Sequence, residues 1–314
     1  MMLHADIKIF ADTIRATSQH TGIKAEFIEK DYWITYILSN LAKSKYESEA
    51  VFKGGTSLSK GYGLIERFSE DIDIAVINNN KKSGNEIKNI IRGIEKEMTK
   101  NLNELQIDGI TSKGSRFRKS VFEYVSTDAK NKNNKLIVEV NSFANPFPFK
   151  QLSIKSLLFD FLIQTGNQKF IDQYNLMPFS VNVLNLEQTL LEKIASLIRF
   201  SFDGNVAQSL SGKIRHFYDL YFLMSNAECV EFVSSDKFKI QFDETMKHDK
   251  DIFDEPIGWR NKSVAESPLI SNFEDIWKNL KGIYKTELSA LAYSPIPDEE
   301  KVSHQFNELM KLIK

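Results

Sequence analysis

Residues 53–76 read KGGTSLSKGYGLIERFSEDIDIAV, in which a Gly-Gly-Thr-Ser turn precedes a short helical segment and an Asp-Ile-Asp strand. Gly54 and Gly55 can adopt backbone angles that are closed to other residues. Their amides, with those of Thr56 and Ser57 at the start of the next helix, can surround a phosphate where the helix dipole favours negative charge. This half of the stretch therefore predicts a binding site for the triphosphate of a nucleoside triphosphate.

The second half of the stretch carries two carboxylates separated by one residue. On a β-strand Asp71 and Asp73 point to the same face, because side chains alternate with a period of two, so they can share divalent metal ions. A Gly-Gly pair or an Asp-x-Asp taken alone is usually structural. Found together and followed by an apolar strand, they favour a metal-dependent nucleotidyl-transfer site.

The nearest competing phosphate motif does not match. A P-loop requires Gly-Lys-Ser/Thr at a fixed distance after its first glycine, whereas here Lys60 lies between Ser59 and Gly61. The sequence therefore does not match the Walker A motif of a P-loop.

A third carboxylate interrupts the apolar strand LIVEV at residues 136–140. Burying a charged side chain alone is costly, so Glu139 is expected to have a partner or a metal. We expect it to join Asp71 and Asp73, to hold a second metal ion and to help deprotonate the attacking hydroxyl. The alternative is a solvated position on an edge strand.

Two helical segments supply further charges. Lys193 lies among apolar residues in LEQTLLEKIASLIRF (residues 186–200) and could bring a cation to the phosphates. Asp219 follows Arg215 by four residues, on the same helical face. From spacing alone, the default interpretation of either charge is a solvated side chain or a salt bridge.

Composition sets limits on the class of protein. The 314 residues include 41 basic and 42 acidic side chains, so no overall positive charge indicates nucleic-acid binding. The single cysteine, Cys229, excludes an internal disulfide framework. The first residues are charged and amphipathic, unlike a secretory signal, and no apolar run is long enough to span a membrane. These features predict a cytoplasmic protein with no membrane partner.

The pattern of apolar residues divides the chain into three regions. We expect an N-terminal helical segment (1–48), a nucleotidyltransferase core with a mixed sheet (49–185) and a helical C-terminal region (186–314). Residues 237–267 are expected to form irregular connections. The predicted fold class is α+β.

The sequence resembles the AbiEii-type toxins, the nucleotidyltransferase half of bacterial type IV toxin–antitoxin systems. The likeness rests on residues 53–76, on FIEKDYWITYIL (27–38), on LNLEQTLLEKIASLIRF (184–200) and on IRHFYDLYFL (214–223). It implies a fold like that of the DNA polymerase β-type nucleotidyltransferases, with the helical C-terminal region completing the cleft.

The resemblance also implies roles for individual residues. Nucleotide phosphates would bind at the turn formed by Gly54, Gly55, Thr56 and Ser57, and metal at Asp71 and Asp73. The later Lys and Asp motifs of the family fall on Lys193 and Asp219, which implies that both belong to the catalytic site. Arg67 and Ser69 would support the site.

Similar toxins transfer nucleotides from an NTP to the acceptor end of tRNA, which inhibits translation. The resemblance therefore implies Mg²⁺ or Mn²⁺, an NTP donor, an RNA acceptor and a cognate antitoxin encoded nearby. Two alternatives stay open. The same site could modify a protein or small-molecule hydroxyl, or the chain could be a catalytically silent module that binds a nucleotide or a partner.

Overall fold

The computed structural model describes residues 1–69, 71–78, 82–128, 131 and 134–313. The chain forms two compact units. Unit 1 consists of Met1–Gly63 and Phe68–Leu184, and unit 2 consists of Leu64–Arg67 and Asn185–Lys314. Each unit is described by itself. The chain therefore passes from one unit to the other three times, and the four residues 64–67 belong to unit 2 although unit 1 flanks them in sequence.

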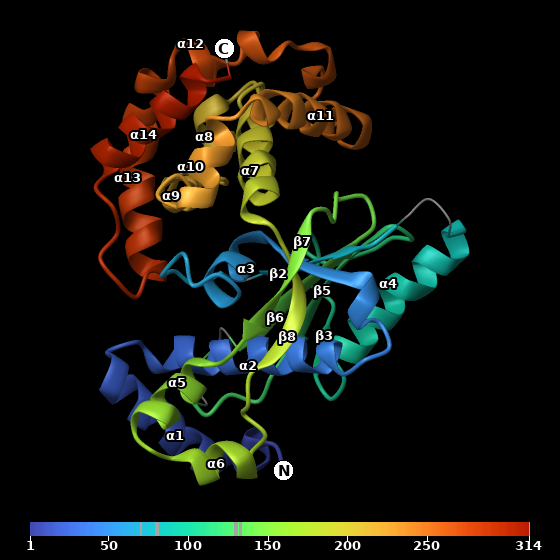
Figure 1. Ribbon diagram of the computed structural model, residues 1–314, viewed down its shortest axis with the longest axis vertical. Coiled ribbons are helices and arrows are strands. Elements are labelled where there is room, and N and C mark those ends of the chain that lie inside the picture. Colours follow the sequence, from blue (N-terminus) through green and yellow to red (C-terminus); the bar gives the residue numbers. More distant parts are fainter. Residues whose placement is uncertain (70, 79–81, 129–130, 132–133, 314) are drawn as a thin grey trace. The chain divides into compact units, whose positions relative to one another are not determined.

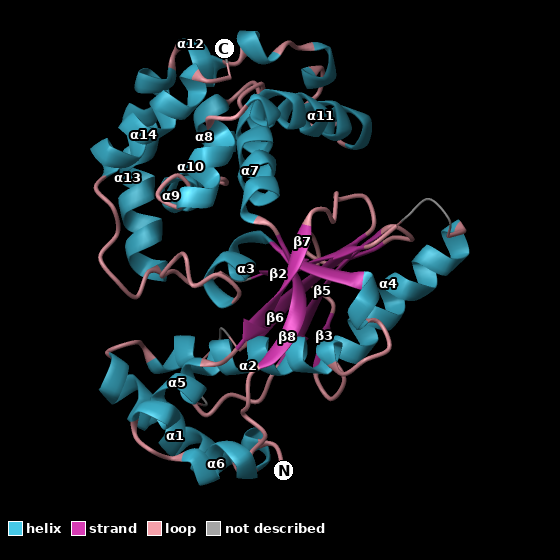
Figure 2. Ribbon diagram, viewed as in Figure 1, coloured by secondary structure: helices cyan, strands magenta, loops and turns pink. Residues whose placement is uncertain are grey.

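Unit 1 is built on an eight-stranded mixed sheet, shown in magenta in Figure 2. The strand order is β3-β5-β6-β2-β1-β8-β7, with β4 paired to β5. The β2–β6 and β1–β8 pairs are parallel, whereas the others are antiparallel. The strands are β1 (Ala50–Lys53), β2 (Asp71–Val76), β3 (Asn103–Leu105), β4 (Ser112–Lys113), β5 (Phe117–Glu123), β6 (Lys135–Asn141), β7 (Phe149–Ile154) and β8 (Phe179–Leu184).

The two faces of the sheet differ in burial. Ile72 and Ile74 of β2 are fully buried, whereas Asp71 and Asp73 between them are only partly buried. The helix α4 (Gly84–Met98) contacts β2, β5 and β6, and also contacts α2 (Ala25–Ala42), which reaches β8. Because side chains alternate along each strand, burial of the isoleucines beneath these helices places both aspartates on the opposite, more open face.

The N-terminal helices belong to the same unit as the sheet. α1 (Ile7–Thr21) and α5 (Leu157–Gln164) pack on α2, and α6 (Gln168–Gln173) packs on α5 (Figure 1). Asp31 of α2 connects three segments. Its carboxylate accepts hydrogen bonds from Lys60 Nζ at 2.6 Å and from Leu157 N at 2.7 Å. The short helices η1 (Leu3–Ala5) and η2 (Glu47–Glu49) complete the described helices of this unit, apart from α3, which belongs to the site.

Unit 2 is helical, apart from the bridge that Arg67 forms with Ala292. Its core includes Phe217, Phe273, Trp277 and Phe306, with neighbouring ring centroids 4.6–6.0 Å apart. Its α-helices are α7 (Leu186–Phe200), α8 (Val206–Ser211), α9 (Ile214–Leu223), α10 (Ala227–Val233), α11 (Asp236–Ile252), α12 (Pro268–Ser271), α13 (Phe273–Leu291) and α14 (Glu299–Lys311), with 3₁₀ turns η3 (Trp259–Asn261) and η4 (Val264–Glu266).

The structure confirms the predicted fold class, a mixed sheet with N-terminal helices and a helical C-terminal region. One prediction was wrong. Residues 237–267 were expected to be irregular, but the first part of this stretch belongs to α11 (Asp236–Ile252). Phe238, Phe242 and Met246 are buried at intervals of four residues, a narrow apolar stripe on an otherwise charged helix. None of the described helices is long and apolar enough to cross a membrane.

Candidate active site

The Gly-Gly turn packs directly against the second aspartate. β1 ends at Lys53, and Gly54 begins α3 (Gly54–Lys60) with φ +78°, a backbone angle that L side chains rarely adopt. A Cβ placed on Gly54 would lie 2.1 Å from Asp73 Oδ2. Glycine is therefore required here twice, for the backbone angle and for the space that the carboxylate occupies.

The hydroxyl groups of the turn donate to backbone carbonyls of β2 and of the turn itself. Thr56 Oγ1 donates a hydrogen bond to Asp71 O at 2.5 Å, and Ser57 Oγ donates to Gly54 O at 2.8 Å. Both residues are buried. The side chain of Lys53, the N-cap residue of α3, makes no capping hydrogen bond to the first turn, where the first amides of a helix have no partner within the helix. This arrangement leaves backbone amides as the groups of the turn best suited to meet a phosphate.

Four charged side chains form a row across the open face of the sheet. The register places Lys53 of β1 beside Asp73 of β2, Asp73 beside Glu139 of β6, and Glu139 beside Lys119 of β5. Asp71 lies on the same face, two residues before Asp73. The structure thus places the three predicted carboxylates on one face, on the neighbouring strands β2 and β6.

Lys119 is a site residue that sequence reasoning missed. Its Nζ lies 2.5 Å from Glu139 Oε1. Burial lowers the pKa of Lys119, but the hydrogen bond to Glu139 and the charges of Glu139, Asp71 and Asp73 outweigh burial, so the pKa lies above its ordinary value. Alternation along FRKSVFE was the available signal, but only strand pairing identifies which residue faces Glu139.

The residues on this face are chemically suited to a hard divalent cation. Carboxylate oxygens are the ligands that Mg²⁺ and Mn²⁺ prefer in proteins, and Asp73 and Glu139 are register neighbours. Among the described residues no three His, Cys, Asp or Glu side chains already gather in a metal-binding cluster. The Glu139 carboxylate instead contacts the Lys119 ammonium. The donor set therefore fits such a metal, with Lys119 as a competing cation.

The other predicted charges meet inside unit 2. Asp219 of α9 accepts hydrogen bonds from Arg67 Nε at 2.8 Å, from an Arg67 terminal nitrogen at 2.7 Å and from Lys193 Nζ at 2.6 Å. Asp219 has no exposed surface. The guanidinium of Arg67 also lies over the Tyr218 ring, 5.9 Å from its centroid. One carboxylate therefore holds two buried cations in place.

Electrostatics in this cluster is dominated by the two cations. Burial raises the pKa of Asp219, but the charges and hydrogen bonds of Arg67 and Lys193 outweigh it and hold the pKa well below its usual range. Burial, with the charge of Lys193 next in size, lowers the pKa of His216 well below its usual range. His216 is therefore neutral at neutral pH.

The predicted site residues thus form two groups. Unit 1 contains Ser69 on the segment that leads into β2, together with the Gly-Gly turn and the three carboxylates. Unit 2 contains Arg67, Lys193 and Asp219, and Arg67 is held there by backbone pairing of its segment with Ala292 and Tyr293. In sequence Arg67 lies four residues before Asp71, so the two groups are also linked by the chain itself.

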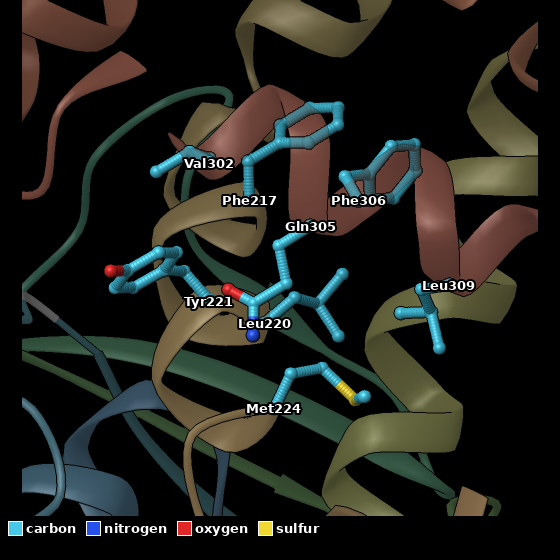
Figure 3. Close-up of a pocket in the computed structure, with 8 residues that line it drawn as sticks. All are labelled: Phe217, Leu220, Tyr221, Met224, Val302, Gln305, Phe306 and Leu309. Atoms are coloured by element: carbon cyan, nitrogen blue, oxygen red, sulfur yellow. The ribbon is translucent and has the colours of Figure 1, made fainter. Parts of the chain in front are cut away.

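A small pocket between α9 and α14 does not belong to these groups. Its lining, drawn in Figure 3, is almost entirely apolar and includes Phe217, Leu220, Val302 and Phe306. Helical periodicity places Asp219 about 160° around α9 from Phe217. The pocket is part of the packing of the two helices rather than of the charged cluster.

Comparison with known proteins identifies the family. Residues 36–304 match the family described as nucleotidyl transferase AbiEii toxin, type IV TA system. Among solved structures, the chain is similar to MenT4, a nucleotidyltransferase toxin from Mycobacterium tuberculosis H37Rv. The two share 14% identity, the match covers 96% of this chain and 99% of that one, and the TM-score is 0.41. A search of curated proteins found no match.

Because the family match spans far more than half of the residues, the chain is a nucleotidyltransferase of the toxin class. It belongs to the AbiEii toxin family of type IV toxin–antitoxin systems. Membership implies a cognate antitoxin.

Proposed function

We propose that this protein transfers a nucleoside monophosphate from an NTP to a hydroxyl of an RNA acceptor, the tRNA 3′ end, and thereby inhibits translation. The observation that carries the proposal is the contact of the Gly-Gly turn with Asp73, on the sheet face that also presents Asp71. Family membership adds the reaction class. A phosphate-binding turn beside paired carboxylates is the combination that nucleotidyl transfer requires.

The reaction is an in-line displacement at the α-phosphorus. The acceptor oxygen forms a bond to phosphorus, the bond to the bridging oxygen of the β-phosphate breaks, and pyrophosphate leaves. Asp71, Asp73 and Glu139 are proposed to hold Mg²⁺ or Mn²⁺, which when bound would neutralise charge on the phosphates. The carboxylates also help to take the proton from the acceptor hydroxyl.

Backbone amides of the turn are proposed to bind the triphosphate, and Lys193, on which the Lys motif of the family falls, is proposed to be a nucleotide-binding residue of unit 2. A lysine ammonium has three N–H donors, and the hydrogen bond to Asp219 uses one of them. In this proposal Asp219 is a positioning residue. Its carboxylate has no exposed surface and orients Lys193 and Arg67 rather than meeting substrate. Ser69 supports the entry to β2.

The proposal is tested by incubating the protein with total bacterial tRNA, Mg²⁺ and each of the four labelled nucleoside triphosphates in turn. Asp71→Asn and Asp73→Asn keep the side-chain shape and should lose at least about a hundredfold in transfer rate. The matched control is Asp108→Asn, a change of the same kind at an exposed position. It should keep the wild-type rate.

Three outcomes separate the alternatives. Label that enters tRNA with the wild-type protein and not with the aspartate variants supports the proposal and identifies the donor. Label that enters a protein or a small molecule instead would move the same chemistry to another acceptor. Nucleotide binding by calorimetry without transfer to any acceptor would contradict an enzymatic role and favour a silent binding module.

A further inference from the structure

The contact between Lys119 and Glu139 adds a positive charge beside the proposed metal site. Both side chains are partly exposed, 27% and 20%, on the same face as the two aspartates. Their strands pair directly, with Lys119 opposite Glu139 and Glu139 opposite Asp73. The ammonium is therefore separated from Asp73 by a single strand, and both aspartates act on it electrostatically.

A carboxylate that accepts a lysine ammonium at 2.5 Å has one of its oxygens already engaged by a cation. Charge-assisted contacts of this kind are among the stronger hydrogen bonds in proteins. A divalent metal that approached Asp71 and Asp73 would need the same carboxylate as a third ligand. It would also meet the positive charge of the lysine.

We propose that Lys119 is a positioning residue that competes with the divalent metal for Glu139. In the metal-free protein Lys119 neutralises Glu139 and holds it against β5. A metal bound at Asp71 and Asp73 would compete with Lys119 for the carboxylate of Glu139. The inference rests on the metal site of the proposed function and adds a residue that tunes how strongly this site binds metal.

The physical reason is the balance of charge on one sheet face. Three carboxylates on adjacent strands repel one another, so a lysine among them stabilises the fold when no metal is present. The same positive charge opposes the arrival of a second cation. Lys119 therefore stabilises the metal-free fold and lowers the affinity of the site for metal.

Direct measurement of Mn²⁺ binding by calorimetry, without nucleotide or RNA, tests the proposal independently of catalysis. Lys119→Met removes the competing charge, so Mn²⁺ affinity should rise about tenfold. Lys119→Arg keeps the charge and should stay within about threefold of wild type. The matched control is Lys113→Met. Lys113 also pairs with a glutamate, Glu104, but its register partner Arg118 faces the other side of the sheet.

A double-mutant cycle separates competition at Glu139 from a general charge effect. Glu139→Gln should lower Mn²⁺ affinity, because the third carboxylate is lost. In that background Lys119→Met should change the affinity by less than about threefold, since no contact remains to compete for. An equal rise of affinity in both backgrounds would overturn the proposal.

Thermal unfolding provides a readout that does not depend on a binding isotherm. Lys119→Met should unfold at a lower temperature than wild type in EDTA, and it should gain more from added Mn²⁺. If wild type binds Mn²⁺ and Lys119→Met binds it no more tightly, competition is wrong while the proposed function stands. If wild type binds no Mn²⁺ at all, both this inference and the proposed metal site are wrong.

Discussion

Gly54 illustrates how much of this site depends on single atoms. Its positive φ turns the chain from β1 into α3, and its missing side chain leaves the space that Asp73 occupies. In unit 2 a single residue is similarly important: the buried carboxylate of Asp219 is the counter-charge for two buried cations, Arg67 and Lys193. At both positions a change of a few atoms would disturb several groups at once.

Replacing Gly54 by Ala should destabilise the protein and disrupt the site. The new Cβ forces both an unfavourable backbone angle and a clash with Asp73, so we expect a loss of about 3 kcal/mol in the free energy of unfolding. Gly109→Ala is the matched control. Its φ of +76° is almost the same, but nothing lies within 4 Å of the added Cβ.

Gly109→Ala should therefore lose only about 1 kcal/mol, the contribution of backbone strain. Urea denaturation of the two variants measures the difference. Equal losses would show that the space beside Asp73 is not restrictive.

Asp219→Asn should destabilise the protein by about 3 kcal/mol at neutral pH, because Arg67 and Lys193 stay buried without a counter-charge. The pKa of Asp219 is depressed in the folded state. Its ionic contribution is thus complete above the unfolded pKa of about 4 and declines as the pH falls further.

Free energies of unfolding measured between pH 8 and pH 2 test the direction of this pH dependence. The gap between wild type and Asp219→Asn should be constant down to about pH 5 and narrow below about pH 4. A gap that instead widens in acid would contradict the assignment of charge in this cluster.

At the scale of elements, α2 acts as a support for the site. Its Asp31 accepts hydrogen bonds from Lys60 at the end of α3 and from the backbone of Leu157 at the start of α5. Lys60 also donates to the carbonyl of Lys155. The position of the Gly-Gly turn therefore depends on a helix outside the sheet, and this accounts for Asp31 within a largely apolar segment.

Asp31→Asn should cost about 3 kcal/mol in unfolding free energy, because the buried Lys60 ammonium loses its counter-charge. Asp160→Asn is the control, since Asp160 pairs with Lys155 at an exposed position and should cost less than about 0.5 kcal/mol. Chemical denaturation of both variants provides the comparison. Similar small losses would mean that Asp31 does not hold α3 in place.

Elements with a strong pattern of apolar residues could be predicted from the sequence, whereas elements with a weak or short pattern could not. The apolar run that begins at Ile72 and the apolar stretch 136–140, interrupted only by Glu139, predicted strands, and they lie in β2 and β6. β7, at residues 149–154, was missed because it lacks a clear alternation and is only partly buried. For α11, the buried residues Phe238, Phe242 and Met246 are separated mostly by charged and polar ones, and the apolar Ile240 is exposed, which made the helical stripe hard to recognise.

At the scale of the whole molecule, the two units differ in charge. Counting the full sequence, unit 1 has 24 Lys and Arg against 20 Asp and Glu, a net charge of +4, whereas unit 2 has 17 against 22, a net charge of −5. The overall charge of −1 conceals this asymmetry. Because phosphate contacts supply much of the affinity for RNA, we expect unit 1 to make most of them.

Arg116 is a suitable residue for testing this expectation. It is exposed in the turn between β4 and β5, the strand that carries Lys119. Arg116→Gln should weaken tRNA binding and lower the salt slope of the affinity by about one. Lys281→Gln, at an exposed position on α13 of unit 2, should leave both unchanged. Equal losses of tRNA affinity at the two positions would contradict the expectation that unit 1 makes most of the phosphate contacts.

The sequence by itself determined the family, through its ordered motifs, and the fold class, through its pattern of apolar residues. It also determined the presence of a glycine turn and an Asp-x-Asp strand, because these depend on local backbone preference and on the period of two along a strand. Only the tertiary structure decided the partners of the charged residues. The pairing of Lys119 with Glu139, of Asp31 with Lys60, and of Asp219 with Arg67 and Lys193 joins residues 20 to 152 positions apart. Such contacts follow from strand register and helix packing, which local sequence patterns do not encode.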